Sequence, residues 1–201
     1  MKKTIVLFVL LYSVNTYLHA QSSDSEVTKF KLGLSYSSFG SNDVFRFNEL
    51  IGAASYDGDN FYNIGLIFSK PLNSWLEMET GLEYSQQSIL ITPAYDPQNE
   101  IKPYNEDFGL IEIPVLLKLR FLKYLFINGG ALISFDTNAT MSVDSQNGLG
   151  GVMGVGAQYD FKCGAAVFVN PYFKLRALIG TERYQQHVAE SGTRIGFTYN
   201  F

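Results

Sequence analysis

Charged side chains recur at even spacing in one stretch of this chain. Glu77, Glu79 and Glu83 are two and four residues apart, so on an extended strand their carboxylates line one face. Such a row can ligate a cation through oxygen atoms or form ion pairs with basic side chains. Lysine and arginine also occur at two-residue spacing further along, which favours ion pairing. The ion-pair candidates are Glu77, Glu79, Glu83, Glu112, Lys118, Arg120, Lys174, Arg176 and Arg194, with Lys31 as a further cation.

A second chemistry to consider is acyl transfer, which needs a nucleophile beside a base. Ser191 follows His187 by four residues, and Glu182 and Glu190 are close by. These residue types are the parts of a lipid-modifying hydrolase. Their spacing does not order them into a triad, and a solvated loop histidine is the simpler interpretation. We therefore expect no catalytic residue.

Other kinds of site have no signature in the sequence. Metal-ligand spacing, a phosphate-binding glycine loop and a nucleotide motif are all missing, so we expect no metal and no cofactor. The single cysteine, Cys163, excludes an internal disulfide. The chain has 19 acidic and 15 basic residues, and this acidic balance argues against a nucleic-acid partner.

The first twenty residues have the organisation of an export signal. Lys2 and Lys3 precede an apolar segment at residues 4–14, and residues 18–20 offer a cleavage site. The apolar run is too short and too interrupted to span a membrane as a helix. We predict a cleavable signal peptide at residues 1–20 and one mature domain at residues 21–201.

Beyond this signal, apolar and polar residues alternate with the period of a β-strand. In one such segment Ile113 and Val115 alternate with Glu112 and Pro114. Because proline cannot donate to a sheet ladder, we expect a bulge or a local break at Pro114. Glycines in the sixth segment are expected to relieve crowding inside a narrow barrel. The eight predicted strands are residues 29–39, 61–70, 75–91, 108–121, 124–135, 148–161, 164–179 and 193–201.

The connections between these segments alternate in length. Long connections at residues 40–60, 92–107, 136–147 and 180–192 alternate with short ones at residues 71–74, 122–123 and 161–163. Outer-membrane barrels have this pattern, with long extracellular loops and short periplasmic turns. We predict an all-β protein of the cell outer membrane: an eight-stranded antiparallel up-and-down transmembrane β-barrel with both termini in the periplasm.

A soluble lipocalin-like barrel would show the same alternation turned inside out, with an apolar lumen. Aromatic residues near strand ends, such as Phe39, Phe121 and Tyr159, favour the membrane barrel, because interfacial girdles lie there. An eight-stranded barrel is just wide enough to be filled by its own side chains. The charged residues therefore predict a plugged, ion-paired lumen rather than a conducting pore.

The chain ends on an alternating strand whose last residue is aromatic. Arg194, Gly196, Tyr199 and Phe201 are spaced as polar residue, glycine, aromatic and aromatic. This spacing resembles the C-terminal signal by which outer-membrane barrels are recognised for insertion, which implies the barrel-assembly machinery as a partner. The alternation predicts that Tyr199 and Phe201 face lipid and that Arg194 points into the lumen.

The segment at residues 110–121, with its Glu112-Ile113-Pro114 core, looks like a leucine-rich strand of the PorT-like outer-membrane β-barrel proteins. Further segments that resemble strands of that family are residues 65–69, 75–88, 124–131 and 150–157. The resemblance covers most of the mature chain. It implies the fold and the outer membrane but no reaction, and a few relatives belong to a protein secretion and attachment system.

The leading functional hypothesis is a non-enzymatic envelope protein with a structural or interaction role, in adhesion or secretion. Its long loops carry acidic residues interleaved with aromatic ones such as Tyr56, Tyr95 and Tyr104, which is typical of a protein-binding surface. Acidic loops can also bridge through divalent cations to lipopolysaccharide phosphates, so outer-membrane lipids are expected partners. The alternatives are a lipid-modifying hydrolase that uses His187 and Ser191, and a soluble ligand-binding barrel.

Overall fold

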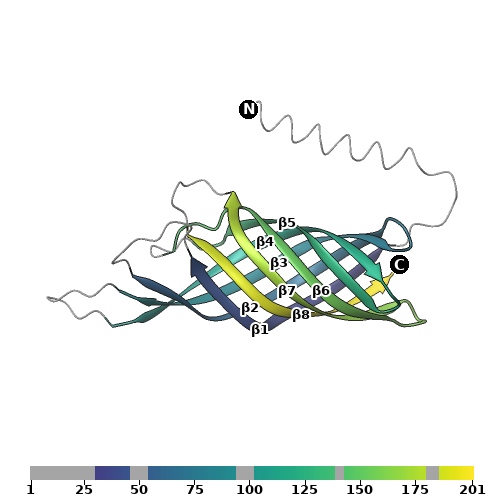
Figure 1. Ribbon diagram of the computed structural model, residues 1–201, viewed down its shortest axis with the longest axis horizontal. Helices are drawn as coiled ribbons and strands as arrows, with labels where there is room; N and C mark the ends of the chain where they lie inside the picture. The colour runs from purple at the N-terminus through teal and green to yellow at the C-terminus, as the bar shows by residue number, and fades with distance from the viewer. Residues whose placement is uncertain (1–29, 46–53, 94–101, 139–142, 180–185) are drawn as a thin grey trace, which may run out of the picture.

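The computed structural model describes residues 30–45, 54–93, 102–138, 143–179 and 186–201. These residues form the strands β1 (Lys31–Phe45), β2 (Ser55–Pro71), β3 (Leu76–Thr92), β4 (Tyr104–Phe121), β5 (Leu125–Asp136), β6 (Gly148–Asp160), β7 (Ala165–Ile179) and β8 (His187–Asn200). Each strand pairs antiparallel with its neighbours in sequence, and β8 returns to pair with β1, which closes a barrel (Figure 1). The predicted eight-stranded antiparallel barrel is confirmed. No helix among the described residues is long and apolar enough to cross a membrane.

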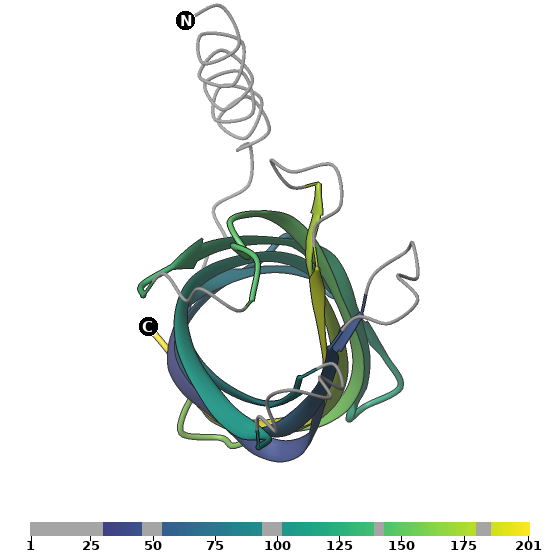
Figure 2. The ribbon, with the colours of Figure 1, turned by 90° about the vertical axis from the view of Figure 1, so that its left-hand side faces the viewer.

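The two ends of the barrel differ in their connections. The C-terminus and the short connections at residues 72–75, 122–124 and 161–164 share one end, here called the turn end (Figure 1). The longer connections lie at the opposite end, here called the loop end, and Figure 2 looks along the ring of strands from that side. The predicted signal peptide at residues 1–20 lies outside the described residues.

The strands extend further toward the loop end than the sequence predicted. β1, β2, β4 and β8 each gain between four and six residues there, so the predicted connections at residues 40–60, 92–107 and 180–192 are too long. Acidic residues in these extensions are held by ladder pairing, as with Asp43 opposite Ala189 and Asp57 opposite Leu90. A paired backbone outweighs the weak strand propensity of aspartate. Other predicted loop residues, such as Tyr95, lie outside the described residues.

The outer wall of the barrel is apolar on every strand. Leu34 is 58% exposed and Leu66 is 59% exposed, although both are large aliphatic residues. The corresponding outward residues on the other strands are Leu82, Leu117, Ile127, Val155, Val169 and Phe197. Side chains of this kind are stable at a surface that lipid covers. The soluble lipocalin-like alternative is therefore wrong, because its apolar face would line the lumen.

The ladders between strands are irregular at several places, and two of them bear on what the sequence predicts. At Pro114 the β3–β4 ladder has a gap with the same register on both sides, so proline breaks the ladder without a bulge. In β7 the register with β6 shifts between Leu149 and Gly151, and Ala177 adopts a φ of 51°. Two-residue alternation from the outward-facing Phe173 predicts that Ala177 faces outward as well, but it is fully buried. The shift in register changes the face of the residues that follow Arg176.

Candidate functional site: a charged network in the barrel lumen

The polar faces of the strands meet inside the barrel and carry the charged residues. The carboxylates of β3 point inward because Glu77, Glu79 and Glu83 occupy alternate positions, and each is at most 5% exposed. β7 and β8 supply the opposing side chains Lys174 and Arg194, also at inward positions. Since an isolated buried charge is costly, a stable barrel must pair these groups. The ion pairs form three groups along the lumen.

Arg176 is the centre of the group nearest the loop end. Its Nε donates to Glu112 Oε1 at 2.6 Å and its Nη2 donates to Glu190 Oε2 at 2.7 Å. All three side chains have no exposed surface. Lys174 joins the same group through Glu83 and through Glu112, the latter at 3.0 Å. One guanidinium and one ammonium therefore hold three carboxylates, which leaves a formal net charge of −1.

Glu190 collects hydrogen bonds from several strands. Besides Arg176, it accepts from Tyr172 Oη at 2.5 Å, from Asn63 Nδ2 at 2.6 Å and from Gln87 Nε2 at 2.7 Å. These donors lie on β7, β2 and β3, and Glu190 itself lies on β8. The carboxylate thus links four strands in one layer across the lumen. We call Glu83, Glu112, Lys174, Arg176 and Glu190 the central layer.

The second group lies between the central layer and the turn end. Arg194 Nη2 lies 2.8 Å from Glu79 Oε1, and Lys118 Nζ lies 4.0 Å from Glu79 Oε2. Lys118 also packs 4.3 Å from the ring centroid of Phe126, and Arg194 packs 5.2 Å from that of Phe168. Cations over aromatic faces gain attraction where water is scarce.

These aromatic rings fit because glycines stand opposite them on the neighbouring strands, Gly156 opposite Phe126 and Gly196 opposite Phe168. A Cβ at Gly156 would lie 2.4 Å from Phe126 Cζ, and one at Gly196 would lie 2.4 Å from Phe168 Cζ. Any side chain at either glycine would displace a ring. The glycine-rich sixth strand thus makes room in the lumen, as predicted.

The third group closes the turn end. Glu77 lies 3.1 Å from Lys31 Nζ and 3.4 Å from Arg120 Nη2, and Arg120 Nη1 lies 2.9 Å from Asp160. Arg120 and Asp160 are partly exposed, so this group borders solvent. Each of the nine ion-pair candidates named from the sequence is therefore part of an ion pair. Glu77, Glu79 and Glu83 of β3 are paired with lysine and arginine side chains of the protein itself. The described residues contain no group of three or more His, Cys, Asp or Glu side chains that could hold a metal ion.

An apolar cluster fills the lumen on the loop-end side of the central layer. Its members are Val44, Ile89, Ile91, Phe108, Leu110, Val143 and Val188. Val143 comes from the connection between β5 and β6, which is fastened to the start of β8. Gln146 Oε1 accepts from the Val188 amide at 3.1 Å, and Gln146 Nε2 donates to the Gln186 carbonyl at 3.0 Å. Residues 143–147 of this connection thus fold over the lumen.

The residues considered for acyl transfer are not brought together. The sequence predicted that His187 lies in a loop, and this is wrong, because His187 is the first residue of β8. Its side chain is buried, and its ring centroid lies 5.6 Å from that of Phe45. Ser191 lies on the same strand, and four residues of strand span about 13 Å. Nucleophile and base need hydrogen-bond distance. Glu182 lies outside the described residues.

Sequence reasoning missed one central residue, Glu190, which it left in a loop. The inward alternation of the last strand continues back from Arg194 through Gly192 to Glu190. That two-residue spacing was available in the sequence. The predicted strand began at residue 193, whereas β8 begins at His187.

Residues 19–180 match the family model of the outer membrane protein beta-barrel domain. The chain belongs to this family. The protein is accordingly an integral β-barrel of the outer membrane. OprG from Pseudomonas aeruginosa is similar in structure, with 15% identity over 87% of this chain and 96% of OprG and a TM-score of 0.51. The outer membrane protein AlkL in lipid bilayers has 10% identity over 90% of this chain and 93% of AlkL, with a TM-score of 0.56.

At these identities the likeness of this outer-membrane barrel to OprG and AlkL concerns the fold alone. A search of curated proteins found no match to the chain.

Proposed function

We propose that this outer-membrane barrel has a closed lumen, carries out no reaction, and serves the envelope as a structural and interaction module. The observation that carries the proposal is the central layer. Its five charged side chains are at most 5% exposed and bind one another across the barrel. A hydrated pore would leave such groups in contact with water.

Two barriers of different chemistry follow one another along the lumen. An ion that passes the apolar cluster at the loop end must lose its hydration shell. In the central layer beyond it, the charged side chains are already paired with one another, so no row of like charges is free to replace that shell. Eight strands enclose a space that side chains can fill completely. The barrel is therefore expected to insulate the two sides of the membrane.

Conductance in planar bilayers tests the closed lumen. The wild-type protein is expected to give no channel steps. A double variant, Arg176→Ala with Glu190→Ala, removes the centre of the layer and is expected to pass ions in bursts. Phe173→Ala, an outward-facing change in the same strand, serves as the control and should stay silent. A steady conductance of the wild-type protein would overturn the proposal.

The orientation belongs to the same proposal: the turn end with both termini faces the periplasm, and the long connections face outward. Cys163 is exposed in the β6–β7 turn and is the only cysteine of the chain. A membrane-impermeant maleimide should label it only after the outer membrane is permeabilised. Asn138→Cys in a Cys163→Ser background supplies a loop-end control that should be labelled in intact cells. Labelling of Cys163 in intact cells would reverse the orientation.

The expected partners are lipopolysaccharide, the barrel-assembly machinery and a protein held by the loops. The acidic and aromatic composition of the long connections supports a protein partner, and the PorT-like resemblance of residues 110–121 favours a role in secretion or adhesion. Replacing residues 46–53 or 94–101 with Gly-Ser sequence should abolish partner capture while the barrel still inserts. If such variants leave partner capture, secretion and envelope integrity unchanged, the loops have no interaction role.

A further inference from the structure

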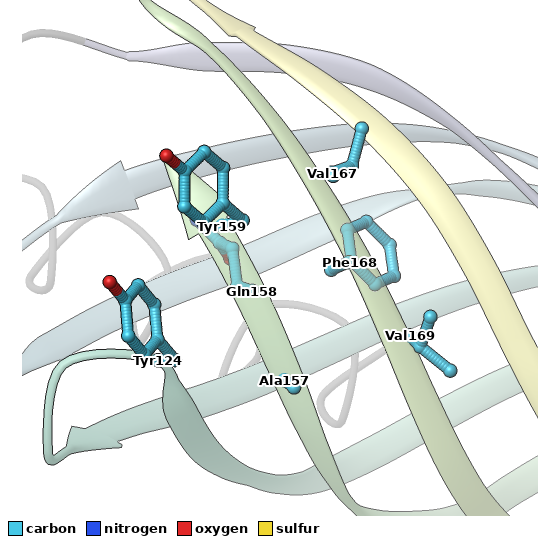
Figure 3. Close-up of a pocket in the computed structure, with 7 residues that line it drawn as sticks. All are labelled: Tyr124, Ala157, Gln158, Tyr159, Val167, Phe168 and Val169. Carbon is cyan, nitrogen blue, oxygen red and sulfur yellow. The ribbon is translucent and has the colours of Figure 1, made fainter. Parts of the chain in front are cut away.

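A groove of about 310 Å³ lies on the outer wall where β6 and β7 approach the turn end (Figure 3). The outward-facing residues that line it are Tyr124, Ala157, Tyr159, Val167 and Val169. Gln158 and Phe168, whose side chains are buried, also border the groove, and the surface that it exposes is almost entirely apolar. The groove opens on the same side of the wall as the lipid-facing side chains, so a lipid can enter it without leaving the bilayer.

The hollow exists because a small residue stands among large ones. Ala157 is paired with Leu125 of β5 on one side and with Val169 of β7 on the other. Its methyl group reaches less far from the sheet than these neighbours or than Tyr159, two residues on. A hollow is therefore left over Ala157, where an acyl chain can lie against apolar side chains.

One wall of the groove is aromatic and ends in polar groups. The rings of Tyr124 and Tyr159 stack with centroids 5.9 Å apart and planes 15° apart. Figure 3 shows their hydroxyl groups pointing to the same side. Tyrosine in this position lies at the level of lipid headgroups, with the ring in the apolar region and the hydroxyl in the interface.

A cation stands beside this aromatic pair. Lys123, in the β4–β5 turn, has its Nζ 5.2 Å from the ring centroid of Tyr124. A side-chain hydrogen bond with Tyr124 raises the pKa of Lys123, so its ammonium stays charged. From the bilayer toward the turn end, the site thus consists of an apolar groove, then two phenol hydroxyls, then a positive charge.

We propose that this groove binds one anionic phospholipid, with an acyl chain over Ala157 and the headgroup phosphate at Lys123. Basic residues next to membrane-spanning segments attract anionic headgroups, and the apolar groove adds the contact area that a lone surface lysine lacks. In cells the proposal rests on the orientation proposed above, which puts the turn end in the inner leaflet. Binding by the purified protein does not depend on that orientation.

Native mass spectrometry of the barrel, released from micelles containing phosphatidylglycerol, tests this site. The wild-type protein is expected to retain one phosphatidylglycerol. Lys123→Gln should lower its retention about fivefold, the factor that corresponds to about 1 kcal/mol for one lysine near an anionic lipid surface. Ala157→Phe fills the groove without changing charge and should lower retention at least as much. If Ala157→Phe does not show the heat-modifiable gel mobility of a folded barrel, the variant Val169→Phe is measured instead, with the same expected loss of retention.

Two controls separate the site from general lipid adhesion. Lys70→Gln and Trp75→Ala remove a lysine and an aromatic near the turn end on the opposite side of the barrel, and both should retain lipid as the wild type does. Inorganic phosphate should not displace the lipid. Equal retention by all variants, or equal retention of phosphatidylcholine and phosphatidylglycerol, would overturn the proposal. Cys163 labelling tests the orientation separately, so failure of one leaves the other standing.

Discussion

Replacing Arg176 with methionine removes the guanidinium that joins Glu112 and Glu190 across the lumen. Both carboxylates have no exposed surface, and the central layer already has a formal net charge of −1. The variant takes it to −2 with Lys174 as the remaining cation. Breaking a buried ion pair in this way costs about 3–5 kcal/mol of unfolding free energy.

The partner substitution Glu190→Gln should cost much less. Glutamine keeps the shape and one oxygen acceptor for Tyr172 and Asn63, and it brings the layer to net neutrality. The expected loss is about 1–2 kcal/mol, the scale of weakened hydrogen bonds to a charged group. Removing the positive partner is thus predicted to be worse than removing the negative one.

Urea unfolding in phospholipid vesicles measures both effects, read by heat-modifiable gel mobility and by the fluorescence of Trp75, the only tryptophan. Leu175→Met places methionine on the outer face of the same strand and should cost less than about 1.5 kcal/mol. If Arg176→Met unfolds with the wild-type midpoint, or if Glu190→Gln is the more damaging change, charge balance does not hold the layer together.

Three further predictions concern the ends and the filling of the barrel. Deleting Phe201 removes a hydrogen bond from its amide to the Phe30 carbonyl at 3.0 Å and a ring stack; it should impair assembly in cells more than the stability of the refolded barrel, and normal surface levels would contradict this. Gly156→Ala should cost about 1–3 kcal/mol through overpacking against Phe126, and Phe126→Leu should restore part of that loss in the same unfolding assay. His187→Ala should leave the lipid profile of the envelope unchanged, and a changed profile would return the hydrolase to consideration.

The C-terminal strand illustrates how far alternation alone reaches. The sequence predicted that Tyr199 and Phe201 face lipid and that Arg194 faces the lumen, and the structure confirms these placements, with Arg194 in an ion pair with Glu79. Whether these residues also act as an assembly signal remains a prediction. A strand has period two, so any run of alternating residues reveals its faces once one face is known to be apolar.

The start of the same strand shows where alternation stops helping. Ser191 and Gly192 belong to the predicted connection at residues 180–192, yet each pairs with both β1 and β7 in the barrel. Strand length at the loop end depends on whether a neighbouring strand reaches the same height. That is a property of the closed sheet rather than of local propensity.

The sequence by itself determined the eight strands, the direction of each face, the apolar outer wall and the set of charges in the lumen. Only the tertiary structure decided which charges meet. Glu112 of β4 binds Arg176 of β7, and Glu79 of β3 binds Arg194 of β8. These pairs join strands that are not neighbours in the sheet. Their meeting depends on ring closure and on the stagger of the strands, which place distant residues at one depth in the lumen.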